Sequence, residues 1–241
     1  MKILAVAFAY NERKYLPDFV NYYRNQGCDI FVLDNDSTDG TGQWLAENEV
    51  KTSICKTEGT FHLLKLQAGL VQAIKEIKPD WVVYTGIDII YSLDLSLYEI
   101  IEQADQAGFN MIGVQHYNMY NTGEGFAIPM KDRFFHARKG NKLYMIAKYQ
   151  EPFGFEADSI QLKDKKIHNA GGVLINYGNC KPAAERIDTF QRRKKAWDKG
   201  LDRNYGVHYL EGMKRNWIWT REEMIDIRQT PDYKYIQKIE I

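Results

Sequence analysis

The alternation of strand-like and helix-like segments is the feature that most constrains the fold of this chain. Over roughly the first 115 residues, short apolar runs typical of buried strands alternate with segments whose apolar residues recur at helical spacing. The expected strands cover residues 3–9, 29–33, 52–56, 81–87 and 109–115, and the helices between them begin near residues 16, 42, 63 and 95. This order predicts an α/β fold with a mostly parallel sheet, right-handed crossovers and helices on both faces.

Beyond residue 115 the alternation gives way to aromatic and charged stretches with scattered glycine and proline. We expect an irregular second half there, with longer loops, a few strands and a helix over about residues 182–199. Since no repeat or low-complexity linker interrupts the chain, residues 1–241 should form a single domain. The 44% of apolar residues is ample for a substantial core.

Overall charge and cysteine content exclude several classes of protein. Thirty-two basic residues balance thirty-two acidic ones, so nucleic acid is not an expected partner. Cys28, Cys55 and Cys180 are widely spaced and odd in number, which is a poor disulfide framework and favours a reducing, cytoplasmic location. No apolar run approaches the ~20 residues of a transmembrane segment, and the short apolar start only imitates a signal peptide.

Polar clusters follow three of the expected strands. They are Tyr10-Asn11-Glu12, the acidic turn of residues 34–39, and Gly86-Ile87-Asp88. Because parallel strands point their carboxyl ends the same way, the clusters should share one cleft. The alternative is that each is only a polar turn or a helix cap, for which Asp, Asn and Ser are favoured.

These motifs, in order and spacing, resemble the nucleotide-binding half of family 2 glycosyltransferases with the GT-A fold. The resemblance covers roughly residues 1–115 and implies a nucleotide-sugar-binding half there, with an acceptor and catalytic half over 116–241. It implies transfer of a hexose from a nucleoside diphosphate sugar, with UDP or dTDP favoured, to a hydroxyl of a glycan or lipid-linked glycan, with inversion. A polysaccharide biosynthesis pathway is part of the same expectation.

The resemblance also assigns nucleotide-binding roles. Tyr10 would stack on the base and Asn35, whose amide both donates and accepts, would pair with its edge. Asp34 and Asp36 are candidates for ribose contacts, whereas Asp39 is expected to cap the following helix. The further nucleotide-binding candidates are Ala9, Asn11, Glu12, Lys65, Gly86 and Ile87.

The family's metal-binding Asp-x-Asp pair is incomplete here, because Gly86 stands where the first aspartate is expected. Asp88 and His168 are the candidate ligands for Mn²⁺ or Mg²⁺, with His208 as the runner-up. A lone histidine is more often a hydrogen-bonded structural residue. The loosely aligned Lys65 is the nearest cation that could help to hold the diphosphate.

A general base must deprotonate the acceptor hydroxyl. Asp158 and then Glu156 are the candidates, and Glu151 remains open, although each could belong to a solvated acidic loop. The basic run over 191–195 is expected to form a solvated helix face, with an anionic lipid-linked acceptor as the alternative.

Two other functions remain open. One is a nucleotidyltransferase-like nucleotide-binding enzyme, which the lack of a glycine-rich phosphate loop after the first strand disfavours. The other is a non-catalytic sugar- or nucleotide-binding module, favoured by the incomplete Asp-x-Asp pair.

Overall fold

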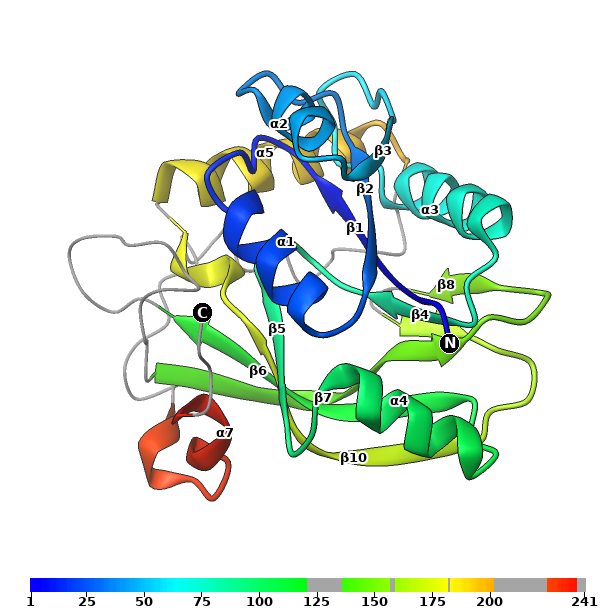
Figure 1. The fold of residues 1–241 in the computed structure, drawn as a ribbon. Coiled ribbons are helices and arrows are strands. Elements are labelled where there is room, and N and C mark those ends of the chain that lie inside the picture. Colours follow the sequence, from blue (N-terminus) through cyan, green and yellow to red (C-terminus); the bar gives the residue numbers. More distant parts are fainter. Residues whose placement is uncertain (121–135, 157–158, 182, 202–224, 238–241) are drawn as a thin grey trace.

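The computed structural model describes residues 1–120, 136–156, 159–181, 183–201 and 225–237, and it confirms the α/β fold class (Figure 1). The main sheet has the strand order β3-β2-β1-β4-β7-β6-β10-β5, and β11 pairs with β7. Its strands are β1 (Ile3–Ala9), β2 (Asp29–Asp34), β3 (Lys51–Ile54), β4 (Trp81–Tyr84), β5 (Ile89–Leu93), β6 (Met111–Tyr120), β7 (His136–Lys148), β10 (Ile167–Asn176) and β11 (Ile225–Asp226). A separate hairpin pairs β8 (Gly154–Glu156) with β9 (Ser159–Gln161).

The helices of the first half begin close to the positions predicted from the sequence. The described helices are α1 (Leu16–Asn25), α2 (Thr41–Glu47), α3 (Leu63–Ile77), α4 (Leu97–Gln106), α5 (Ala183–Asp198) and α7 (Tyr233–Gln237). Pro17 fits the first turn of α1, and a capping box of Ser96 and Glu99 starts α4. None of the described helices combines the length and apolar composition needed to cross a bilayer.

Strands β3, β2, β1 and β4 are parallel throughout and form the nucleotide-binding type of sheet expected for the first half. Gly42 of α2 lies against the side chain of Asp34, and Gly69 of α3 against that of Leu33. Because neighbouring residues of a strand face opposite sides of the sheet, α2 and α3 cover opposite faces. The order 3-2-1-4 places the reversal of strand order between β1 and β4, where α/β sheets bind ligands.

The predicted strand over residues 81–87 is wrong in its extent, because β4 ends at Tyr84 and a separate strand, β5, begins at Ile89. Three strands lie between β4 and β5 in the sheet, yet only residues 85–88 join them in the chain. The sheet must therefore curl. The hydroxyl of Tyr23 stabilises the turn between β4 and β5, since it contacts Thr85 Oγ1 (2.6 Å) and donates to the carbonyl of Ile89 (3.0 Å).

The second half contributes more regular structure than expected. Strand β7 is antiparallel to both β4 and β6, while β10 is parallel to β6 and antiparallel to β5. The curl thus carries the end of β10 back to the end of β4, where the Tyr177 N–H donates to the Asp88 carbonyl (2.8 Å). The helix expected over 182–199 is confirmed as α5, which runs along the end of the sheet at which β1 and β2 finish (Figure 1).

The prediction that Asp39 is the N-cap of α2 is wrong. Gly40, whose φ of 89° suits glycine, holds that position, and Asp39 lies one residue earlier. The Asp39 carboxylate still accepts the backbone N–H groups of Thr41 (3.0 Å) and Arg13 (2.9 Å), so it fixes the start of the helix from outside it.

Candidate active site

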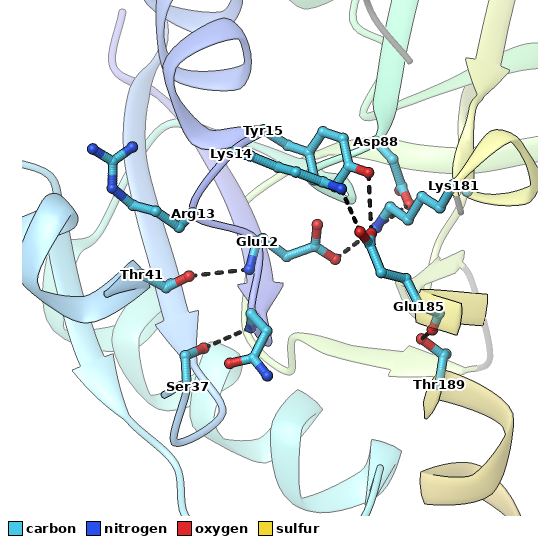
Figure 2. A network of polar contacts seen from close by, with 12 residues as sticks. Glu12, Arg13, Lys14, Tyr15, Ser37, Thr41, Asp88, Lys181, Glu185 and Thr189 are labelled. Carbon is cyan, nitrogen blue, oxygen red and sulfur yellow. Dashed lines mark hydrogen bonds and ion pairs between the residues drawn. The ribbon is translucent and has the colours of Figure 1, made fainter. Parts of the chain in front are cut away.

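The loops after β1 and β2 are joined by hydrogen bonds at one end of the sheet. The Asn11 N–H donates to Ser37 Oγ (2.9 Å), and Asn11 Oδ1 accepts the N–H of Thr38 (2.8 Å). The Glu12 N–H donates to Thr41 Oγ1 (3.0 Å), as Figure 2 shows. The first two polar clusters of the sequence therefore lie together, as the parallel arrangement predicts.

The three carboxylates of the acidic turn have different surroundings. Asp34 is buried and accepts the Ser37 N–H (3.0 Å), which closes the turn. Asp39 holds the backbone of Arg13 and Thr41. Asp36 has a left-handed backbone conformation (φ 59°), and its carboxylate, like that of Asp39, is exposed. Two of the three carboxylates of this turn, Asp34 and Asp39, therefore have a structural role.

Tyr10 and Asn35 meet at one place, and Arg192 of α5 lies between them and solvent. The Arg192 guanidinium lies 3.2 Å from the centre of the Tyr10 ring. Asn35 is oriented by its neighbours: its Nδ2 donates to Thr57 Oγ1 (2.8 Å) and to the Cys55 carbonyl (2.9 Å), and its Oδ1 accepts from Arg192 Nη2 (2.6 Å). Arg192 therefore makes the two contacts that the sequence assigned to a nucleobase.

The third polar cluster meets the first through Lys181, which follows the 3-10 turn Gly178–Cys180 after β10. Lys181 Nζ lies 2.6 Å from Glu12 Oε1 and 2.9 Å from Asp88 Oδ2, so one ammonium bridges the ends of β1 and β4 (Figure 2). The three side chains are 12–19% exposed. Beside them, the Tyr15 hydroxyl donates to Glu185 Oε2 (3.0 Å).

The surroundings of Glu12 and Lys181 raise the pKa values of both side chains. Burial raises the pKa of the Glu12 carboxyl to about 7, although Lys181 opposes the change. Burial acts to lower the pKa of Lys181, but Asp88 and Glu12 outweigh it and raise that pKa above its ordinary value. Lys181 therefore remains charged at neutral pH, whereas Glu12 exchanges its proton there.

A testable consequence concerns stability against pH. Glu12 has its ordinary pKa of 4.5 in the unfolded chain and about 7 when folded, so the folded protein holds this proton more tightly. Between pH 4.5 and 7 the unfolded chain releases the proton first, and the Glu12 contribution to the free energy of unfolding falls as pH rises, by at most about 1.4 kcal/mol per pH unit. Urea unfolding of Glu12→Gln at pH 5, 6, 7 and 8 should lack this decline.

The matched control is Glu47→Gln, which alters an exposed carboxylate on α2 and should keep the wild-type dependence on pH. Equal slopes in the wild type and in Glu12→Gln would contradict the raised pKa of Glu12.

Gly86 stands where the first aspartate of an Asp-x-Asp pair is expected. A Cβ at this position would lie 2.8 Å from Asp88 Oδ1, so a side chain there would require the end of the Asp88 side chain to shift. The neighbouring Ile87 side chain is buried in the core, which leaves only its backbone to face a ligand. Ala9 is also buried, and its carbonyl accepts the Asn35 N–H (2.8 Å).

His168 does not lie with Asp88. It is the second residue of β10, pairs with Ile112 near the start of β6, and packs against Phe109. Tyr177, the residue bonded to the Asp88 carbonyl, lies nine positions further on, which along a strand is roughly 25 Å or more. The prediction of a shared metal site is therefore wrong for His168. His208 lies outside the described residues.

The other predicted residues are scattered. Lys65 is exposed and donates to the Lys56 carbonyl (2.7 Å). Glu151 bonds Tyr149 (2.6 Å), whose N–H donates to the carbonyl of Asp80 just before β4, so it lies at the opposite end of that strand from Asp88. Asp158 lies outside the described residues.

Glu156 is the last residue of β8, on a hairpin that reaches the sheet end. The ring of the preceding Phe155 lies 4.6 Å, centre to centre, from that of Tyr84, the last residue of β4. Glu156 itself is exposed. The hairpin therefore lies near the end of β4, with the Glu156 carboxylate unburied.

Sequence reasoning missed Lys181 and misjudged the basic run. Gln191, Lys194 and Lys195 are exposed as predicted, but Arg192 is buried and Arg193 lies over the ring of Phe61 (4.5 Å). The available signal was position: Arg192 lies on the helix predicted over 182–199, and Lys181 lies just before that helix.

The fold is that of an α/β protein with a nucleotide-binding type of sheet, and its polar clusters lie at the reversal of strand order. The model of glycosyl transferase family 2 matches residues 5–170, and the chain belongs to that family. Helix α5 follows the matched segment.

Comparison with solved structures finds S. aureus TarS. The TarS crystal structure has a TM-score of 0.40 and 19% identity over 53% of this chain and 23% of TarS. TarS 1-349 in complex with UDP has a TM-score of 0.39 and 19% identity over 55% of this chain and 40% of that one. The matched region thus spans less than half the length of these chains. Comparison with curated proteins finds no match.

Proposed function

We propose that this protein transfers a hexose from a nucleoside diphosphate sugar, with UDP or dTDP as the favoured nucleotide, to a hydroxyl of a glycan or lipid-linked glycan, with inversion. The observation that carries the proposal is the meeting of the predicted polar residues at one sheet end, beside the reversal of strand order between β1 and β4, in a chain of glycosyl transferase family 2. Tyr10 follows β1, Asn35 follows β2 and Asp88 follows β4, at the place where α/β sheets hold nucleotides.

The surroundings of Arg192 support a base site beside Tyr10. A planar, hydrogen-bonding guanidinium stacks on this ring and pairs with Asn35. A pyrimidine has the same two properties, because its faces stack and its edge both donates and accepts. In the proposed complex the base takes these contacts, and the exposed Asp36 accepts a ribose hydroxyl.

The proposed reaction is a single displacement. The acceptor oxygen bonds to the anomeric carbon while the bond from that carbon to the diphosphate oxygen breaks, and the diphosphate leaves with the electron pair. The proton of the acceptor hydroxyl passes to a carboxylate, for which Asp158 and Glu156 are the candidates. The contact of Phe155 with Tyr84, the last residue of β4, supports this part of the proposal because it brings β8 near that strand end.

A positive charge near the departing diphosphate is required, and family 2 resemblance suggested Mn²⁺ or Mg²⁺ on Asp88. The residues present do not fit such an ion. Asp88 Oδ2 and Glu12 Oε1 both face the Lys181 ammonium at hydrogen-bonding distance, so a divalent ion between them would have to displace a buried cation. Among the described residues, no three His, Cys, Asp or Glu side chains are grouped to hold a metal.

The test is calorimetric titration of the wild-type chain with UDP, dTDP and GDP, followed by turnover assays of the corresponding nucleotide sugars. We expect one pyrimidine nucleotide to bind and its hexose derivative to be consumed. Failure of every nucleotide to bind would refute the proposal. Pyrophosphate release from a nucleoside triphosphate would favour the nucleotidyltransferase alternative, and binding without turnover would favour the non-catalytic module.

A further inference from the structure

Lys181 lies in the crevice where the strand order reverses. Glu12 follows β1 and Asp88 follows β4, the two strands on either side of the reversal, and the Lys181 ammonium bridges their carboxylates (Figure 2). Its side chain is 12% exposed. Since burying an ammonium is costly unless it is paired, the two carboxylates fix the position of this charge.

Polar atoms around Lys181 are incompletely bonded. Within the described part of the chain, the buried Glu12 Oε2 has no hydrogen-bond donor, and the buried Nε of Arg186, in the first turn of α5, has no acceptor. Buried polar atoms normally have partners. A nucleoside diphosphate sugar can supply both missing partners, because its hydroxyls donate to a carboxylate and its phosphate oxygens accept from a guanidinium.

An ammonium group has three N–H donors, and Glu12 and Asp88 take two of them from Lys181. One donor therefore remains for a phosphate oxygen. Arg186 adds a second positive charge in the first turn of α5, close to Cys180, the residue before Lys181.

We propose that Lys181 binds the diphosphate of the donor sugar and supplies the positive charge that family members take from a divalent ion. The inference rests on the proposed function. When the bond between the anomeric carbon and the diphosphate oxygen breaks, the electron pair stays on that oxygen, and the Lys181 ammonium stabilises the new negative charge without giving up its proton. The acceptor proton goes to the carboxylate base.

The experiment compares nucleoside diphosphate binding with nucleoside binding by calorimetry, using UDP with uridine and dTDP with thymidine, in EDTA and in Mn²⁺. For the wild type, we expect the nucleotide that binds to do so in EDTA within about threefold of its affinity in Mn²⁺. Lys181→Met should weaken nucleoside diphosphate binding about 10- to 100-fold, the effect of losing one charge-assisted hydrogen bond, while nucleoside binding stays unchanged. Lys181→Arg should retain part of the affinity.

Removal of Lys181 leaves two buried carboxylates facing each other, so Lys181→Met could be unstable. The double variant Glu12→Gln/Lys181→Met removes one of these charges and, compared with Glu12→Gln, isolates the effect of the ammonium. Binding that requires Mn²⁺, or equal affinity for the nucleoside diphosphate with and without Lys181, would overturn the inference and leave the proposed function intact. Absence of nucleotide binding to the wild type would overturn both.

Discussion

Replacing Arg192 with alanine is expected to strengthen binding of the nucleoside and of its diphosphate by roughly tenfold. Arg192 stacks on Tyr10 and bonds Asn35, so a base can make these contacts only after the guanidinium has left them. A stack of a cation on an aromatic ring is worth about 0.5–2 kcal/mol, and the roughly 1.4 kcal/mol that corresponds to a tenfold change lies within this range. Calorimetry with uridine, thymidine and their diphosphates measures the change.

The matched control is Lys195→Ala, which removes an exposed cation from the same helix and should leave affinity for the nucleoside unchanged. Weaker nucleoside binding by Arg192→Ala would contradict the expectation and show that the guanidinium contacts the bound nucleotide. A nucleoside has no phosphate, so this comparison separates the base site from the charge effect assigned to Lys181.

Trp81→Ala is expected to lower the free energy of unfolding by about 3–5 kcal/mol, the range for removal of a large buried aromatic side chain. Trp81 begins β4 and is the largest fully buried side chain among the described residues. Its indole N–H donates to Asp105 Oδ1 (3.0 Å), which also accepts from Lys148 Nζ (2.7 Å). The substitution therefore leaves a cavity and removes a hydrogen bond that ties β4 to α4. Urea unfolding measures the effect.

Trp197→Ala provides the comparison, because Trp197 lies on α5 and is 36% exposed. A change within about 0.5 kcal/mol is expected for a surface substitution of this kind. If Trp81→Ala cost less than about 1 kcal/mol, the start of β4 would not belong to the core.

The first half of the fold could be predicted from the sequence because its signals are local. The apolar run of β1, the helical spacing of α3 and the start of α1 at Leu16 each lie within one short segment. Strands of a parallel sheet buried on both faces read as continuous apolar runs, which makes them easy to find.

The second half was harder to predict because its strand order depends on pairing between segments that are far apart in the chain. Strand β7 contains five basic residues among thirteen and gives no clear alternation. Strand β10 is interrupted by Gly171 and Gly172, where its register with β6 shifts. The short turn before β5 looked like the end of one strand, since Gly86 was the only break in the apolar run.

Sequence reasoning predicted which side chains lie together at this sheet end, but not which residues of the second half contact them. Tyr10, Asn35 and Asp88 do lie at one sheet end, because parallel strands place them there. Lys181 and Arg192 could not be assigned, since their partners lie more than 90 positions away and only the curled sheet and the docked α5 bring them near.

Helix α5 buries few of its described apolar side chains against the sheet. Among the described side chains of α5, those of Arg192 and Ala196 are buried. Helix α3, by contrast, buries Leu63, Leu66, Gln67, Leu70, Ala73 and Ile74. Polar contacts hold α5 instead, among them the pairing of Lys14 and Tyr15 with Glu185 and the contacts of Arg192. Because Arg192 occupies the proposed base site, the free energy of releasing its guanidinium from Tyr10 and Asn35 is subtracted from that of nucleotide binding, so substitutions on α5 that change how firmly Arg192 is held should change affinity without altering the contacts of the base.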